Sequence, residues 1–108
     1  MARKFKLTNQ ERGDCATAVI VGSGRFNIND KLAEIEGVID QLIEGSERKG
    51  TMYVFDGCNE DQEFDLSEKQ FNRLINDLKS YNWASAIMAI GAKKLVAKLE
   101  EVPTIKEE

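Results

Sequence analysis

Apolar residues recur every three or four positions in parts of the chain, which is the spacing of an amphipathic helix. This spacing predicts helices in residues 30–45, 68–80 and 83–102. Ser67 and Gln70 form the S-x-x-Q pattern of a capping box just ahead of the second of these segments. The sequence therefore predicts where that helix begins as well as which face it buries.

The segment that ends at residue 21 allows two interpretations. Thr8 and Glu11 form a second capping box, T-x-x-E, which predicts a helix that continues through the letters DCATAVIV. The β-branched run at residues 19–21 would also suit a buried strand. We favour the helix, which Gly22 and Gly24 would then end.

Two short segments have the composition or the alternation of strands. Residues 51–55 (TMYVF) are β-branched and aromatic, and residues 63–66 (EFDL) alternate polar with apolar positions, so we expect the two to pair as a hairpin. Residues 46–50 (SERKG) are interpreted as a loop. Because an isolated hairpin is only marginally stable, the sheet needs residues 4–7 as a third strand, or the edge of a partner.

These elements predict an α+β fold, mainly helical with about four helices, and a small two- or three-stranded antiparallel sheet. The 108 residues suffice for one domain. We expect a globular domain over residues 1–102 and a charged C-terminal tail over residues 103–108. A domain of this size buries only about two-thirds of its unfolded surface, so oligomerisation would stabilise it.

The composition restricts the chemistry that the chain can perform. The sequence has no histidine, which excludes Ser-His and Cys-His nucleophiles, imidazole bases and the usual zinc sites. Cys15 and Cys58 are far apart in the sequence and form no C-x-x-C motif, so both are interpreted as reduced thiols, Cys15 in the core. We predict no catalytic residue, no metal site and no cofactor.

The charge restricts the partners. With 15 basic and 19 acidic residues the net charge is −4, which argues against direct nucleic-acid binding. No apolar run has the length of a membrane span, and the opening residues lack the apolar core of a secretory signal. We expect a cytoplasmic protein without a membrane partner. Four basic residues near the start suggest either a flexible charged terminus or a basic arm: Arg3, Lys4, Lys6 and Arg12.

The letters GSGR at residues 22–25 are a candidate phosphate-binding turn. Gly22, Ser23 and Gly24 could present backbone N–H groups to an anion, and Arg25 could add positive charge. The dinucleotide fingerprint requires a further glycine where Asn27 stands, and no G-K-[ST] follows. The turn is therefore interpreted first as a connector and second as a nucleotide or phosphate contact at a homo-oligomer interface.

A run of carboxylates follows the first predicted strand. It comprises Asp56, Glu60, Asp61, Glu63 and Asp65, the first four of which are the candidate surface residues. The spacing does not fit an EF-hand, because Cys58 and Asp61 occupy positions where that loop needs an oxygen ligand and a glycine. The run is interpreted as a solvated acidic turn or as an acidic surface that faces a partner.

Residues 83–92 (WASAIMAIGA) would be apolar around most of a helix, with small residues between the large ones. Such a helix is either central to a core or buried in an interface. Tyr81 and Trp83 belong to residue types that are enriched at binding hot spots, and Ile87 lies one turn further on. We therefore place a homodimer or partner interface at this segment, as the alternative to a core helix.

The sequence thus favours a non-enzymatic interaction module. We expect a small acidic inhibitor, adaptor or regulator, of the kind encoded by phages or mobile elements, that binds a larger protein and forms a homodimer. The alternative is a small-ligand binding protein that uses residues 22–25.

Overall fold

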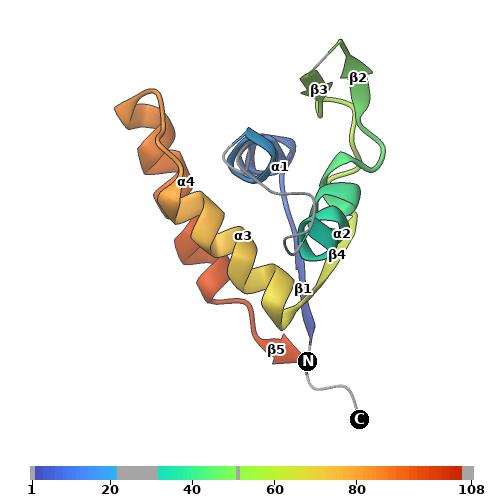
Figure 1. Cartoon of the computed structure of the whole chain (residues 1–108), viewed down its shortest axis with the longest axis vertical. Coiled ribbons are helices and arrows are strands. Elements are labelled where there is room, and N and C mark those ends of the chain that lie inside the picture. The colour runs from blue at the N-terminus through green and yellow to red at the C-terminus, as the bar shows by residue number, and fades with distance from the viewer. Residues whose placement is uncertain (1, 22–31, 51, 106–108) are drawn as a thin grey trace.

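The computed structural model describes residues 2–21, 32–50 and 52–105. In chain order the elements are β1 (Ala2–Lys6), α1 (Asn9–Ala16), a π-helical turn η1 (Thr17–Val21), α2 (Leu32–Ile43), β2 (Glu47–Lys49), β3 (Met52–Val54), β4 (Glu63–Ser67), α3 (Glu68–Ser80), α4 (Ala86–Glu100) and β5 (Thr104–Ile105). The fold is α+β and mainly helical, as predicted. Figure 1 shows α3 and α4 along one edge, α1 nearly end-on between α4 and the β2–β3 hairpin, and that hairpin on the side away from α4.

The strands pair differently from the predicted hairpin. β3 pairs with β2, with Glu47 opposite Val54, and β4 pairs with β1, with Phe5 opposite Phe64. The segment interpreted as a loop is thus strand β2, whose three residues are all exposed and show no apolar alternation. β4 pairs with β1 because Phe64 is buried on the core face of β4, where its ring stacks on Phe5 with 5.6 Å between centroids.

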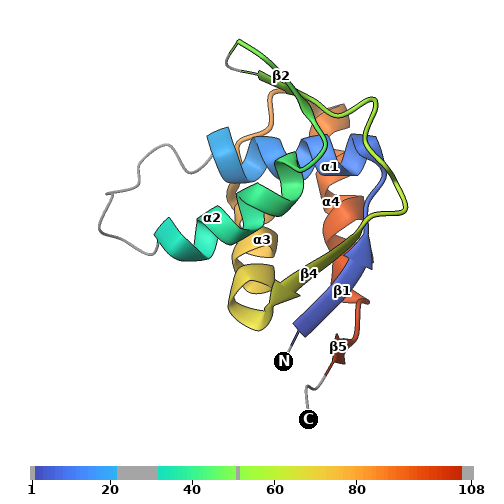
Figure 2. The same ribbon diagram turned by 90° about the vertical axis from the view of Figure 1, so that its right-hand side faces the viewer.

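The segment predicted as a charged tail contains a strand. Thr104 and Ile105 form β5, which pairs antiparallel with Arg3 and Ala2. The first sheet therefore has three strands in the order β4–β1–β5, with the N-terminal strand in the centre. Figure 2 shows β5 beside the start of β1, at the end of the molecule opposite to β2.

Both capping boxes are confirmed. The Thr8 hydroxyl accepts a hydrogen bond from the Glu11 N–H (3.2 Å), and the Glu11 carboxylate accepts one from the Thr8 N–H (2.9 Å). Ser67 and Gln70 repeat this exchange at the start of α3. The helical interpretation of the segment before residue 22 is also confirmed, although its last turn widens into the π-helical η1.

The last helix begins later than predicted. It starts at Ala86, and the Ser85 side chain caps it by accepting a hydrogen bond from the Met88 N–H (3.2 Å). Tyr81 and Trp83 therefore lie in the connection between α3 and α4. The physical reason is that a serine hydroxyl satisfies a free N–H group of the first helical turn, which stabilises a helix that begins just after it.

One core joins the helices to the three-stranded sheet. Its largest fully buried apolar side chains include Phe64 and Leu66 from β4, and Leu42, Phe71, Leu74, Leu78 and Leu99 from the helices. Cys15 is also fully buried, as predicted. Only one face of α4 contributes to this core, through Ala92, Leu95, Val96 and Leu99.

Candidate functional site

The candidate phosphate turn, Gly22, Ser23, Gly24 and Arg25, lies outside the described residues. The remaining candidates lie in two regions of the fold. One is the acidic connection between β3 and β4, and the other is the start of α4 with the connection before it.

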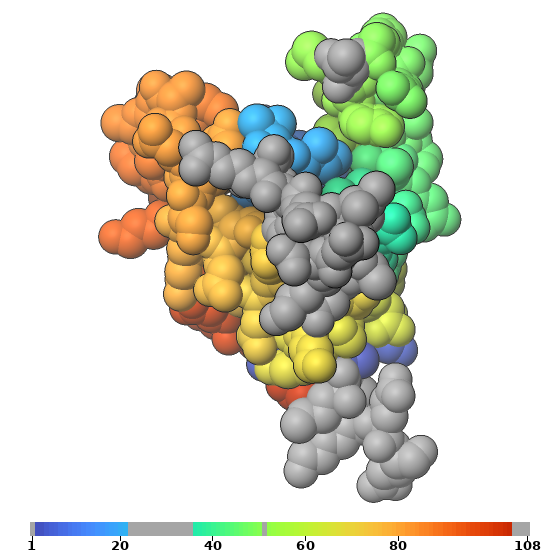
Figure 3. Space-filling view, viewed as in Figure 1, coloured from blue at the N-terminus to red at the C-terminus, as the bar shows by residue number. Residues whose placement is uncertain are grey.

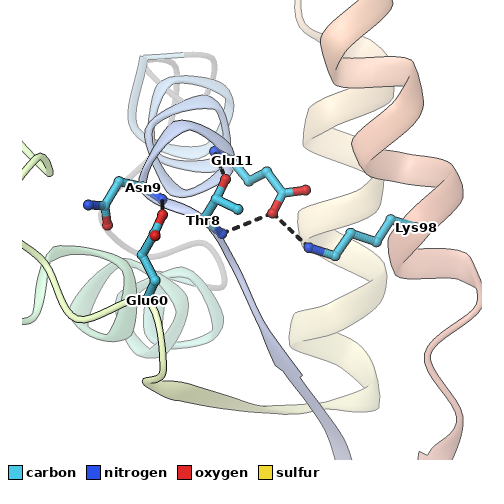
Figure 4. A network of polar contacts seen from close by, with 5 residues as sticks. All are labelled: Thr8, Asn9, Glu11, Glu60 and Lys98. Atoms are coloured by element: carbon cyan, nitrogen blue, oxygen red, sulfur yellow. Dashed lines mark hydrogen bonds and ion pairs between the residues drawn. The ribbon is translucent and has the colours of Figure 1, made fainter.

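Glu60 in the acidic connection has a structural partner. Its Oε2 accepts a hydrogen bond from the Asn9 N–H at 2.7 Å, and the Asn9 side chain donates to the Asp56 carbonyl at 3.1 Å. Figure 4 shows the Glu60 side chain directed at the first residue of α1. A carboxylate at this position satisfies a free N–H group and interacts favourably with the positive end of the helix dipole. Glu60 therefore holds the acidic connection against α1.

The other acidic candidates remain exposed. The side chains of Asp56, Asp61 and Glu63 face solvent. The Asp61 N–H donates a hydrogen bond to Asn59 Oδ1 at 3.0 Å. Cys58, in the same connection, is buried. Glu60 is exposed as well, but its carboxylate already accepts a hydrogen bond from the Asn9 N–H.

A second carboxylate at the start of α1 also binds within the chain. Glu11 Oε1 accepts hydrogen bonds from the Thr8 N–H and from Lys98 Nζ, the latter at 2.7 Å (Figure 4). Partial burial alone would raise the pKa of Glu11, but these hydrogen bonds outweigh it and hold the pKa below its ordinary value. Lys98 lies on α4, so this ion pair ties α4 to the start of α1.

Tyr81 and Trp83 pack against each other at the end of α3. Their rings meet edge to face with 4.7 Å between centroids, and both pack against the core. Trp83 Nε1 donates a hydrogen bond to the Leu78 carbonyl at 3.3 Å. Because the last carbonyls of a helix lack partners within the helix, the indole acts as a C-terminal cap for α3. Both residues are therefore partly structural.

The start of α4 exposes large apolar side chains. Ile87 is 83% exposed, Ile90 54% and Met88 42%. These are three of the five large apolar side chains that are exposed in the part of the chain that the structure describes; the other two are Val21 and Met52. Figure 3 shows this end of α4, in orange, at the upper-left edge of the molecule. Apolar side chains gathered on an exposed helix end are typical of an interaction surface.

A groove lies beside this surface, between α3 and α4. It has a volume of about 470 Å³, with Leu78, Trp83, Ala92 and Val96 among its apolar lining residues. The structure thus brings Trp83 and the start of α4 together. No hydrogen bond or ion pair found within the described residues joins them to the acidic candidates Asp56, Asp61 and Glu63.

Two of the four basic residues near the start of the chain, Arg3 and Arg12, are held by contacts within the fold, whereas the side chains of Lys4 and Lys6 on β1 are exposed. Arg12 is 1% exposed. Its guanidinium donates to the carbonyls of Gln41, Leu42 and Glu44 at the end of α2, and to the Gln62 side chain. Arg3 donates to both Glu68 carboxylate oxygens and lies over the Phe71 ring. Sequence reasoning missed both roles, because the partners are distant in the sequence.

Within the described ranges, no three His, Cys, Asp or Glu side chains lie close enough together to hold a metal ion. No helix in these ranges has the length and apolar character needed to cross a membrane. Comparison of the chain with known protein families, curated proteins and solved structures finds no match.

Proposed function

We propose that this chain is a non-enzymatic protein-interaction module, an inhibitor, adaptor or regulator that acts by binding a larger protein. The observation that carries the proposal is the exposure of Ile87 and Ile90 on α4, with Met88 beside them. Soluble monomers rarely leave several large apolar side chains together in water, because their burial is favourable by about 25 cal/mol per Å². A partner that covers this surface would gain that free energy.

The fold around this surface supports a binding role. α4 is anchored by its buried face and by the Glu11–Lys98 ion pair, so the exposed side chains are presented on a fixed helix. Trp83 lies next to the helix start and is partly exposed. A rigid helix that carries apolar anchors loses little conformational entropy on binding.

The homodimer expected from the sequence remains part of the proposal. The same side chains could cover one another in two copies of the chain, because a two-fold interface uses one surface patch twice. The experiment must therefore distinguish a second copy of this chain from a different protein as the partner.

Site-specific photo-cross-linking tests the proposal. A photo-reactive amino acid replaces Ile87 in one version of the chain and exposed Lys49 of β2 in a matched control, each expressed in the cells that naturally contain the protein. We expect a discrete adduct from position 87 that is absent from position 49 and is lost when Ile90→Asp is added. An adduct of twice the 12.1 kDa chain mass would identify a second copy, and a heavier one would identify another protein. No adduct at position 87, or equal adducts at both positions, would contradict the proposal.

A further inference from the structure

The groove between α3 and α4 has an apolar floor and small residues along one wall. Leu78, Ala92 and Val96 are buried at its base, and Trp83 lies at its upper end. Ala89 and Ala97 line the α4 side and are exposed. Alanine leaves the helix backbone accessible, so an occupant can approach α4 closely. The volume of about 470 Å³ is within the range of binding pockets, roughly 300–1,000 Å³.

The walls favour a helix as the occupant. Both sides of the groove are α-helices, whose backbone N–H and C=O groups are already paired within each helix. An extended peptide would find no backbone partners for its own polar groups there, whereas a helix carries its hydrogen bonds within itself. The indole N–H of Trp83 is already bound to the Leu78 carbonyl, so the polar side chains left to recognise an occupant are Lys79, Lys93 and Glu100.

The charge at the groove defines the chemistry of that helix. Lys93 lines the groove and is exposed, and it has no ion-pair partner among the residues that the structure describes. Lys79, on the opposite wall, pairs with Glu100 at 2.9 Å, and this exposed pair spans the groove from α3 to α4. Neighbouring Lys94 adds a further positive charge, so this surface is locally basic in a chain whose net charge is −4. The positive charges of Lys93 and Lys94 attract carboxylates.

We propose that the groove between α3 and α4 binds an amphipathic helix of the partner protein, with its apolar side chains between Trp83 and Val96 and with acidic side chains at Lys93. This inference rests on the proposed function and adds the chemistry of the partner to it. The bound helix would lie beside α3 and α4 as a third helix, and the Lys79–Glu100 pair would mark the lower end of its apolar contact.

A library of displayed helical peptides tests this inference. The peptides share an alanine-rich scaffold in which one face is randomised, and they are selected on the full chain. We expect the enriched peptides to carry apolar residues at i, i+3 or i+4, and i+7, together with Asp or Glu beside them. Their affinity is then measured by fluorescence anisotropy on the unaltered chain and on variants.

Two charge reversals provide a matched pair of variants. Lys93→Glu and Lys94→Glu change the net charge equally and are adjacent on the same exposed helix, but only Lys93 lines the groove. We expect Lys93→Glu to weaken binding about tenfold, a difference of about 1.4 kcal/mol, and Lys94→Glu to weaken it less than about threefold. A peptide with Lys in place of its acidic residue should recover affinity for Lys93→Glu. Ala97→Trp, which fills the groove, should abolish binding, and circular dichroism checks that each variant remains folded.

Several outcomes would overturn the inference. They are the absence of any selected peptide, enrichment of peptides without acidic residues, equal loss of affinity in the two charge reversals, and binding that survives Ala97→Trp. These results are distinguishable from failure of the proposed function. An adduct at position 87 without groove binding overturns the groove inference and leaves the proposed function intact, whereas the absence of that adduct contradicts the proposed function even where a selected peptide binds the groove.

Discussion

Arg12 and Leu42, which are 30 residues apart in the sequence, connect α1 with α2: Arg12 Nε donates a hydrogen bond to the Leu42 carbonyl at 2.5 Å. The same guanidinium reaches the carbonyls of Gln41 and Glu44, and it lies 5.2 Å from the centre of the Phe64 ring. The last carbonyls of α2 have no partners within the helix, and they carry the negative end of the helix dipole. A buried arginine thus replaces the usual solvent contacts of a helix C-terminus.

Arg12→Met is therefore expected to destabilise the protein strongly. The variant keeps an apolar side chain but leaves buried carbonyls without donors, each at a cost of about 1–3 kcal/mol. We expect the free energy of unfolding, measured by urea denaturation, to fall by about 3 kcal/mol or more. Arg48→Met is the control, because Arg48 is exposed and, within the described part of the chain, its side chain bonds only to the nearby Gly50 carbonyl. A loss in Arg12→Met no larger than in the control would contradict this role.

The Glu11–Lys98 contact should make stability depend on pH. The folded-state pKa of Glu11 lies below its ordinary value, so the contact stabilises the fold above about pH 4.3, the pKa of an unperturbed glutamate. That contribution is lost as the pH falls through the folded-state pKa. Glu11→Gln should cost about 0.5–1 kcal/mol at pH 7, typical of an ion pair near the surface that is only partly exposed.

The difference between Glu11→Gln and the unaltered chain should shrink as the pH falls below about 4. Urea denaturation at a series of pH values measures it. Asp14 has the opposite tendency, since burial and, to a lesser extent, the nearby Glu11 raise its pKa. Comparing the variant with the unaltered chain cancels the effect of Asp14 burial, which is the larger cause. A constant difference from pH 7 to pH 3 would show that the carboxylate charge of Glu11 is unimportant.

Ile87→Asp separates binding from folding. Because Ile87 is 83% exposed, the substitution should change the free energy of unfolding by less than about 0.5 kcal/mol while preventing capture of the partner. Leu95 lies on the buried face of the same helix. Leu95→Ala removes this buried side chain and should lower the free energy of unfolding by about 2–5 kcal/mol. Thermal unfolding and the cross-linking yield are measured together. A large loss of stability in Ile87→Asp would mean that Ile87 belongs to the fold rather than to an interface.

Gly91→Ala should stabilise the isolated chain. Gly91 lies inside α4, and a Cβ placed there would meet no atom within 4 Å. Alanine exceeds glycine in helix propensity by about 1 kcal/mol, so the melting temperature should rise. Gly37→Ala is the contrasting variant, because its Cβ would meet the Gln70 side chain. A lower melting temperature for Gly91→Ala would indicate that this glycine is required for close packing.

Local signals in the sequence predicted the helices well. Thr8–Glu11 and Ser67–Gln70 each act within four residues, so the sequence alone places the two helix starts. Strand pairing was not predictable in the same way. β2 consists of exposed charged residues, and β1 meets β4 across some sixty positions, so neither pairing leaves a local pattern.

The candidate site was predictable where it depends on local sequence and unpredictable where it depends on the packing of distant segments. The apolar character of residues 83–92 is visible in the sequence, and the structure leaves Ile87 and Ile90 exposed. The groove could not be foreseen, because it depends on how α3 and α4 pack and on where Trp83 lies between them. The burial of Arg12 likewise follows only once the end of α2 is placed against α1.

The pairing of Ala2 with Ile105 has a practical consequence for protein engineering. Paired residues of neighbouring antiparallel strands have Cα atoms about 4.5–5.5 Å apart, so a few added residues could close the chain into a ring. New ends could then be opened in the exposed connection between β3 and β4 to give a circular permutant. The same geometry would allow residues 2–105 to be grafted into a surface loop of a carrier protein, with both junctions at one edge of the three-stranded sheet.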